Sequence, residues 1–192
     1  SLSALGFEAP VFVTRGAPIV PSAARMHEII LGPGCALLVA TGSSDSMDVD
    51  LYLADESGLE LDSDTEVRSS AIVRRCYSEP TVQRVAVKAY GREGSYALAV
   101  VRAPSSIDGV EGLRLAEASA PFRARGYESR ETFQIELEEG GRSSRGVGVP
   151  AGRCVALIAA GAEGMRDIDL RVLDVAGNAI ASDAAPQPFA SA

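Results

Sequence analysis

The sequence has few aromatic residues and a single histidine, and it lacks the motifs of the common catalytic sites. It contains no tryptophan, only five phenylalanines and five tyrosines, and a single histidine, His27. A serine hydrolase needs an oriented base beside its nucleophile, but no Gly-x-Ser-x-Gly elbow occurs, and His27 lies among apolar neighbours as a strand residue would. The glycines mark turns and form no phosphate-binding loop. We therefore expect a protein that is not an enzyme.

Long apolar runs and basic clusters are also missing. No stretch of about 18 apolar residues occurs, which excludes a helix spanning a membrane. The formal net charge is −8, and the arginines at 74–75 and at 123–125 form groups too small for a nucleic-acid patch. The sequence begins at Ser1 without a methionine, which is typical of a processed or excised segment.

Cysteine is scarce, with three residues, and two of them are placed where they can pair. Cys35 opens one apolar stretch, and Cys76 ends another 41 positions later. A disulfide between them would stabilise the folded chain by about 4 kcal/mol in the chain-entropy model. It would also indicate an oxidising location: secreted, cell-surface or periplasmic. Two buried, reduced thiols are the alternative. Cys154 has no partner in this sequence.

The sequence does contain an internal repeat. Residues 48–55, Asp-Val-Asp-Leu-Tyr-Leu-Ala-Asp, return 119 positions later as residues 167–174, Asp-Ile-Asp-Leu-Arg-Val-Leu-Asp. Residues 35–64 align with 154–183 without a gap, and 11 of these 30 positions are identical. Apolar residues alternate with polar ones, and an aspartate and a glycine follow, at Asp55 and Gly58 in the first copy. This pattern predicts a strand, a type I turn with a left-handed glycine, and a return strand, twice.

The fold class follows from the repeat and from the composition. With 19 glycines, 10 prolines and no clear helical stripe, the chain is predicted to be all-β, with two tandem antiparallel β-sandwich domains of jelly-roll-like form. We expect the first repeat at residues 1–104, a linker at 105–121 with a short strand at 112–116, and the second repeat at 122–192. A further half-exposed strand is predicted at 133–137.

The second repeat is predicted to be short of strands. By the offset of 119, the counterpart of the strand at 72–77 would begin only at the last residues, and the two strands after it would have no counterpart. Open sheet edges and part of a core would then be exposed. A longer parent protein, a partner's strand or the linker itself could fill the gap, and we favour the first two. Phe189 and Cys154 are predicted to lie at the edge that receives a partner strand.

The repeated frame resembles the bacterial pre-peptidase C-terminal domain family. The residues that carry the resemblance are Asp48-Val49-Asp50-Leu51-Tyr52-Leu53, the hairpin Gly58, and Gly91-Arg92-Glu93-Gly94-Ser95-Tyr96-Ala97-Leu98. The resemblance covers the first repeat and the front two thirds of the second. It implies compact, non-catalytic β-sandwiches attached to exported proteins, and related collagen-binding modules bind calcium and fibrous substrates. The cysteine pair is not a general family feature, and Arg171 replaces the tyrosine of the first copy.

Recurring carboxylates are the only candidate ligand set. Alternate residues of a strand share a face, so Asp48 and Asp50 would lie about 7 Å apart, and loop carbonyls with Asp64 could complete a calcium site. The second copy offers Asp167, Asp169 and Asp183. Solvated or turn-forming aspartates are the alternative, because an aspartate at a turn accepts hydrogen bonds from backbone N–H groups without any metal.

Two functions from different classes remain open. The first is a secreted, non-catalytic binding or accessory module that docks on a polymer, a cell surface or a partner protein. The second is a structural protomer of an extracellular filament, coat or matrix that assembles through sheet edges and strand exchange. A protein partner or self-association is expected in both cases.

Overall fold

The computed structural model describes residues 7–129 and 131–192, and the protein is built mainly from antiparallel β-strands. Residues 12–102 carry the first eight strands. These are β1 (Phe12–Ile19), β2 (Ala24–Leu31), β3 (Gly34–Gly42), β4 (Asp48–Asp55), β5 (Glu60–Asp64), β6 (Ser70–Tyr77), β7 (Thr81–Tyr90) and β8 (Gly94–Arg102).

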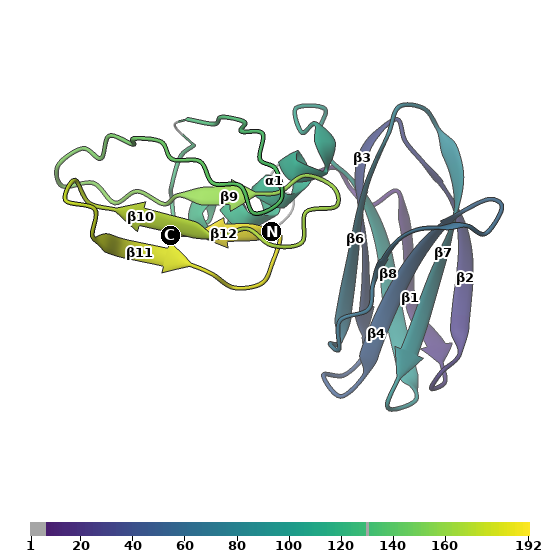
Figure 1. Ribbon diagram of the computed structural model, residues 1–192. Coiled ribbons are helices and arrows are strands. Elements are labelled where there is room, and N and C mark those ends of the chain that lie inside the picture. The colour runs from purple at the N-terminus through teal and green to yellow at the C-terminus, as the bar shows by residue number, and fades with distance from the viewer. Residues whose placement is uncertain (1–6, 130) are drawn as a thin grey trace.

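The eight strands form two four-stranded sheets that face each other (Figure 1). The strand order is β1-β8-β3-β6 in one sheet and β2-β7-β4-β5 in the other, and all neighbours are antiparallel. This confirms the all-β prediction for residues 12–102. The consecutive strands β7 and β8 belong to different sheets, and each lies inside its sheet between two neighbours.

The interior of the sandwich follows the period-two pattern of the sequence. Val49, Leu51 and Leu53 of β4 are fully buried, as are Val85 and Val87 of the adjacent β7. Branched apolar side chains suit a pleated surface with one buried face, and each of them stabilises the fold by about 1.5–3 kcal/mol when it is removed from water. The hydrophobic effect therefore holds the two sheets together at these positions.

The linker forms a helix, so the prediction of a short strand at 112–116 is wrong. The helix α1 extends over Gly109–Arg123, with Glu111 in its first turn and Arg123 in its last, where the helix dipole favours these charges. Alanine and leucine fill its middle, and these residues have high helix propensity. In the described ranges, no helix combines the length and the apolar character that crossing a membrane would require.

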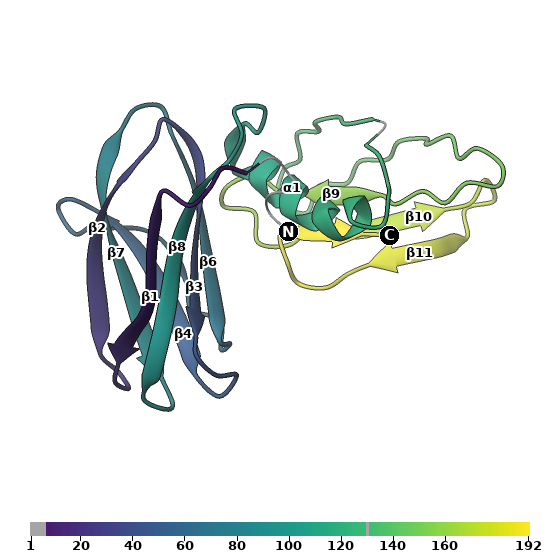
Figure 2. The same cartoon turned by 180° about the vertical axis from the view of Figure 1, so that it is seen from behind.

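The helix connects the sandwich to the rest of the chain (Figures 1 and 2). Its Leu113 is fully buried in a small cluster with Leu37 of β3 and Val101 of β8. These strand residues alternate with Leu38 and Val100, which face the interior, so α1 packs on the outer face of the β1-β8-β3-β6 sheet. Further along, α1 packs against strands of the second repeat.

The second repeat, residues 122–192, contains four short strands in two separate two-stranded sheets. The strands are β9 (Ile158–Ala160), β10 (Leu170–Leu173), β11 (Ala179–Asp183) and β12 (Phe189–Ser191), and the pairs are β9 with β12 and β10 with β11. These strands close no sandwich of their own within the described residues. The division into two sandwich domains therefore stays a prediction.

Candidate functional site

The second repeat copies the strand register of the first. In the hairpin β4–β5, Leu51 lies opposite Asp64, and in β10–β11 Leu170 lies opposite Asp183, each 119 positions later. Every other pair of the two ladders corresponds in the same way, and both ladders shift register before their last pair. Strand register depends on turn geometry and side-chain pattern, so the repeated sequence has produced a repeated structure.

The two hairpin turns are also the same. The Asp55 carboxylate accepts hydrogen bonds from the backbone N–H groups of Ser57 at 2.8 Å and Leu59 at 3.0 Å. Asp174 accepts the equivalent bonds from Ala176 at 2.9 Å and Asn178 at 2.8 Å. The predicted glycines, Gly58 and Gly177, adopt positive φ angles of 92° and 85°. Hydrogen bonds lower the pKa of both carboxyl groups. The largest cause is the Ser57 hydroxyl for Asp55 and the side-chain amide of Asn178 for Asp174, and the backbone N–H groups add to it.

The pair β9–β12 likewise corresponds to β3–β6. Phe189, Ala190 and Ser191 lie opposite Ala160, Ala159 and Ile158, which is the register of residues 70–72 against 41–39 in the first repeat. The hydrogen bond that connects this strand pair to the neighbouring hairpin is also repeated. Asp64 Oδ2 accepts the Ile72 N–H at 2.7 Å, and Asp183 Oδ2 accepts the Ser191 N–H at 2.9 Å.

The two repeats differ in whether β3 and β4, or their counterparts β9 and β10, have a second paired strand. In the first repeat β3 also pairs with β8, and β4 also pairs with β7. Within the described residues, β9 pairs only with β12 and β10 only with β11. The second repeat therefore has two open edges, one on β9 and one on β10.

Residues 131–157 form no strand, so the prediction of a strand at 133–137 is wrong. The first repeat shows the physical reason. There, β1 pairs with β8 and β2 pairs with β7. Among the described residues, the second repeat has no counterpart of β7 or of β8. A strand without a hydrogen-bonded neighbour has no ladder to stabilise it.

The open edges expose apolar side chains whose counterparts are core residues. Leu51, Leu53 and Leu38 are fully buried, whereas their counterparts Leu170, Val172 and Leu157 are all partly exposed. An open apolar groove of about 230 Å³ lies here, and its wall includes Val149, Val155, Leu157, Val172 and Ile180. Val149 is 60% exposed and Ile180 is 66% exposed. This groove is the candidate binding site.

The carboxylates predicted as metal ligands in the first repeat bond to backbone N–H groups and to neighbouring side chains. Asp48 accepts the Arg68 N–H at 3.0 Å, and Asp50, which is only 5% exposed, accepts the Tyr52 hydroxyl at 2.8 Å. Asp64 bonds to Arg68 as well as to β6. In residues 7–129 and 131–192 no group of three or more His, Cys, Asp or Glu side chains could hold a metal ion.

In the second repeat the same ligand set is dispersed. Asp167 and Asp169 are exposed in the segment that leads into β10, and Asp183 accepts hydrogen bonds from the backbone N–H groups of Ala185 and Ser191. Both hydrogen bonds lower the pKa of the Asp183 carboxyl group, the one from Ser191 more strongly.

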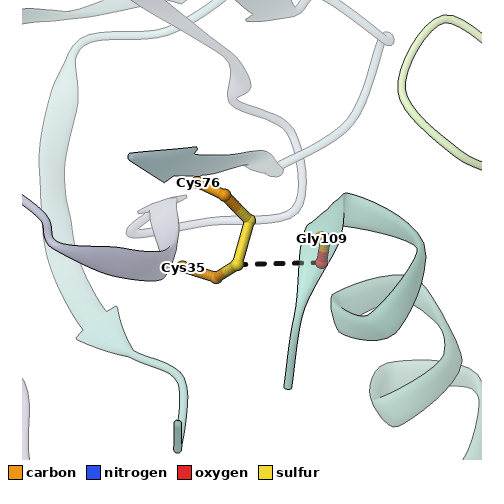
Figure 3. The surroundings of a disulfide bond; sticks show 3 residues. All are labelled: Cys35, Cys76 and Gly109. Atoms are coloured by element: carbon orange, nitrogen blue, oxygen red, sulfur yellow. Dashed lines mark hydrogen bonds between the residues drawn. A yellow bond between two sulfur atoms is a disulfide. The ribbon is translucent and has the colours of Figure 1, made fainter. Parts of the chain in front are cut away.

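The predicted disulfide is present. Cys35 of β3 and Cys76 of β6 are direct register partners, and their sulfur atoms are bonded. The bond lies beside the first residue of α1, where Cys35 Sγ is 3.7 Å from the Gly109 carbonyl oxygen (Figure 3). An oxidised sulfur carries no proton, so this approach is a van der Waals contact and not a hydrogen bond. The disulfide thus joins two strands beneath the helix.

The two residues predicted at the receiving edge lie apart from each other. Cys154, the counterpart of Cys35, is exposed and free. Phe189 is half-buried on β12 and pairs with Ala160 of β9. Because β12 corresponds to β6, the outermost strand of its sheet, the open edge lies on the other side of β9 from Phe189.

The single histidine is held in the first sandwich. His27 Nε2 lies 2.7 Å from the Tyr96 hydroxyl, and the ring of Phe12 packs edge-on against the imidazole. Burial lowers the pKa of His27.

Sequence reasoning missed the polar contacts that hold α1 in place. Arg74 Nε of β6 donates to Glu117 of the helix at 2.6 Å, and Arg114 of the helix donates to the carbonyl oxygens of Gly161 at 2.8 Å and Ala162 at 2.5 Å. Burial lowers the pKa of Arg114. No sequence motif marks these residues. The groove residues, in contrast, could have been found from the sequence, because the residues 119 positions before several of them are predicted core positions of the first repeat.

No protein-family model matches the chain, and no curated protein matches it.

Proposed function

We propose that the chain is a secreted or cell-surface, non-catalytic binding module that holds a partner polypeptide along the open edges of its second repeat. The observation that carries the proposal is the pair of missing neighbours on β9 and β10, strands whose counterparts β3 and β4 are paired on both sides. An open edge presents unpaired N–H and C=O groups, and an extended peptide can add to it as a further strand.

Two further observations support the proposal. The Cys35–Cys76 disulfide is of a kind that persists in oxidising compartments, as the surface of a cell or its exterior would provide. The sequence frame resembles a domain family of non-catalytic modules on exported proteins. Together these favour a binding role outside the cytoplasm.

A binding selection tests the proposal directly. Random 12-residue peptides are selected on the immobilised full chain and then tested on two variants, Val172→Asp in the groove and Val82→Asp on the exposed side of β7. We expect strand-forming peptides whose binding is lost in Val172→Asp and kept in Val82→Asp, with far-UV circular dichroism confirming that both variants are folded. Recovery of no peptide, or of peptides indifferent to Val172→Asp, would overturn the proposal.

A structural protomer that assembles through sheet edges is the second candidate. It is favoured by exposed apolar side chains of the β10–β11 hairpin, such as Leu173, 53% exposed, and Ile180, 66% exposed. Size-exclusion chromatography with light scattering separates the two functions. A monodisperse monomer favours the binding module, whereas concentration-dependent multimers that Val172→Asp abolishes favour the protomer.

Calcium binding by the Asp48 and Asp167 frames is a separate proposal that rests on their shared carboxylate pattern. Selective binding to the folded state would raise the thermal midpoint in millimolar calcium relative to chelator. Equal midpoints in calcium and in chelator would end this proposal.

A further inference from the structure

We infer that the partner segment is a β-hairpin that enters the second repeat in the place that β7 and β8 occupy in the first. This inference rests on the proposed function and specifies its ligand. The equivalence of register is the starting point, because it allows each position around the groove to be compared with a filled position in the same molecule.

The strand order explains why the segment is a hairpin and not a single strand. In the first repeat β7 pairs with β4, and β8 pairs with β3, so the two strands complete different sheets. A turn of three residues, 91–93, joins them. The open edges of the second repeat are on β10 and β9, the counterparts of β4 and β3. One hairpin can cover both edges, whereas a single strand would leave one open.

The groove defines the inward face of the hairpin. Val155, Leu157 and Val172 in its wall correspond to Ala36, Leu38 and Leu53. In the first repeat these counterparts belong to one core with residues of β7 and β8, namely Val85, Val87, Ala89, Tyr96, Leu98 and Val100. The hairpin that fits the groove therefore alternates, with small branched side chains inward on one strand and larger apolar ones on the other.

Charge defines one position on its outward face. Lys88 of β7 lies directly opposite Asp50 of β4, and the counterpart of Asp50 is Asp169, the residue immediately before β10. Asp169 is exposed, and Asp167, also exposed, lies two residues before it in the segment that leads into β10. A hairpin with lysine or arginine opposite Asp169 complements this edge, since cross-strand pairs of opposite charge are favourable.

A second copy of the chain does not supply the hairpin. Each chain carries one β7–β8 hairpin, and that hairpin is already part of the core of its own first repeat. Transfer of the hairpin to another chain's second repeat would open one groove for each groove it fills. The occupant is therefore a β-hairpin that lies outside the described residues of this chain.

The test uses the chain's own hairpin as the probe. A peptide of residues 74–102, carried on a small soluble protein to keep it monomeric, is titrated into the full chain. We expect saturable 1:1 binding by calorimetry, more than about tenfold tighter than either half, 74–90 or 94–102, because linked strands bind with a high effective concentration. Charges on the inward face, Val87→Asp with Leu98→Asp, should abolish binding, and Val82→Asp on the outward face should preserve it.

Charge reversal tests the pairing opposite Asp169. Lys88→Glu in the peptide should weaken binding by about two- to fivefold, the range of an exposed ion pair, and Asp169→Lys in the chain should restore it. Asp45→Lys, at an exposed loop position, is the control and should restore nothing.

Cys154 reports the register. Cys76 of the bound peptide would lie opposite Cys154, as it lies opposite Cys35 in the first repeat. With oxidised glutathione as oxidant, the two thiols form a disulfide, and one glutathione disulfide is reduced to two glutathione molecules. We expect this crosslink by mass spectrometry with the 74–102 peptide, and much more slowly with a scrambled sequence that keeps its cysteine.

The outcomes separate the two levels of the proposal. If the hairpin binds no better than its halves, or if the scrambled peptide crosslinks equally fast, the hairpin inference is wrong while strand addition survives in the selected 12-residue peptides. If no peptide of either kind depends on Val172, the proposed function fails as well. Self-association that the hairpin cannot displace would assign the groove to a second copy and overturn the inference.

Discussion

Cys35 and Cys76 lie opposite each other on adjacent strands, whereas Cys154, the counterpart of Cys35, is exposed and free. Thiol titration of the denatured, unreduced chain should therefore find one thiol. Cys35→Ser with Cys76→Ser should destabilise the protein by up to about 4 kcal/mol, because the closed loop restricts the unfolded chain. Cys154→Ser is the control and should leave the urea midpoint unchanged. Three titratable thiols would contradict the structure.

Asp55 and Asp174 give the hairpin turns a pH dependence of defined sign. Hydrogen bonds to the carboxylates hold both pKa values below the ordinary value in the folded chain. Their stabilisation is therefore complete above the unfolded-state pKa of about 3.9 and is lost as the pH falls through the lower, folded-state pKa. The thermal midpoint should decrease as the pH is lowered below about 4. The double variant Asp55→Asn with Asp174→Asn should show a smaller decrease.

The matched control is Glu56→Gln, beside Asp55 on the same turn. Glu56 is exposed, and its carboxylate accepts no hydrogen bond from the described residues. An acid dependence that is the same in the double asparagine variant as in the parent would show that these two carboxylates do not stabilise the fold.

Strands 119 positions apart have the same sequence pattern but different surroundings. Leu51 of β4 is fully buried, and Leu170 of β10 is partly exposed because β10 has only one neighbour. Leu51→Ala should cost about 2–5 kcal/mol, and Leu170→Ala should cost less than half as much. Urea unfolding followed by circular dichroism measures both losses. Equal losses would mean that β10 is covered as completely as β4.

The elements that the sequence predicted well are those with short-range signals. Asp55 and Gly58 define a turn through their own backbone hydrogen bonds, and alternation over 48–53 defines the strand before it. The disulfide could be predicted from the ends of two apolar strands. Asp50 was predicted as a calcium ligand or, alternatively, as a solvated or turn-forming aspartate, yet it is buried, with the Tyr52 hydroxyl bonded to it and Lys88 across from it.

The elements that were missed depend on contacts distant in sequence. The helix α1 packs on both the first sandwich and the β9–β12 pair, so its apolar residues form no single stripe, and Gly112 and Pro121 interrupt its pattern. The segment at 133–137 alternates as a strand does, but a strand forms only beside a neighbour. Its pattern could not indicate that no neighbour is present among the described residues.

At the scale of the whole molecule, the two repeats share a sequence pattern but differ in how many of their strands are paired on both sides. The first is a closed sandwich in which β7 and β8 complete both sheets, and the second has matching hairpins and matching register with two open edges. The helix α1 joins the two through Arg74–Glu117 and Arg114–Gly161, and an ion pair links Arg75 to Glu163. This difference between the two repeats is the physical basis for proposing that the second repeat binds a partner.

Hydrogen–deuterium exchange of the full chain without any ligand tests this difference most directly. The comparison is between residues 24–38, which include β2 and part of β3, and residues 143–157, which lie 119 positions later in the sequence. We predict strong protection of those amides in 24–38 that bond to β7, β6 or β8, and near-unprotected exchange across 143–157. Comparable protection of the two segments would contradict the open second repeat and, with it, the proposed binding site.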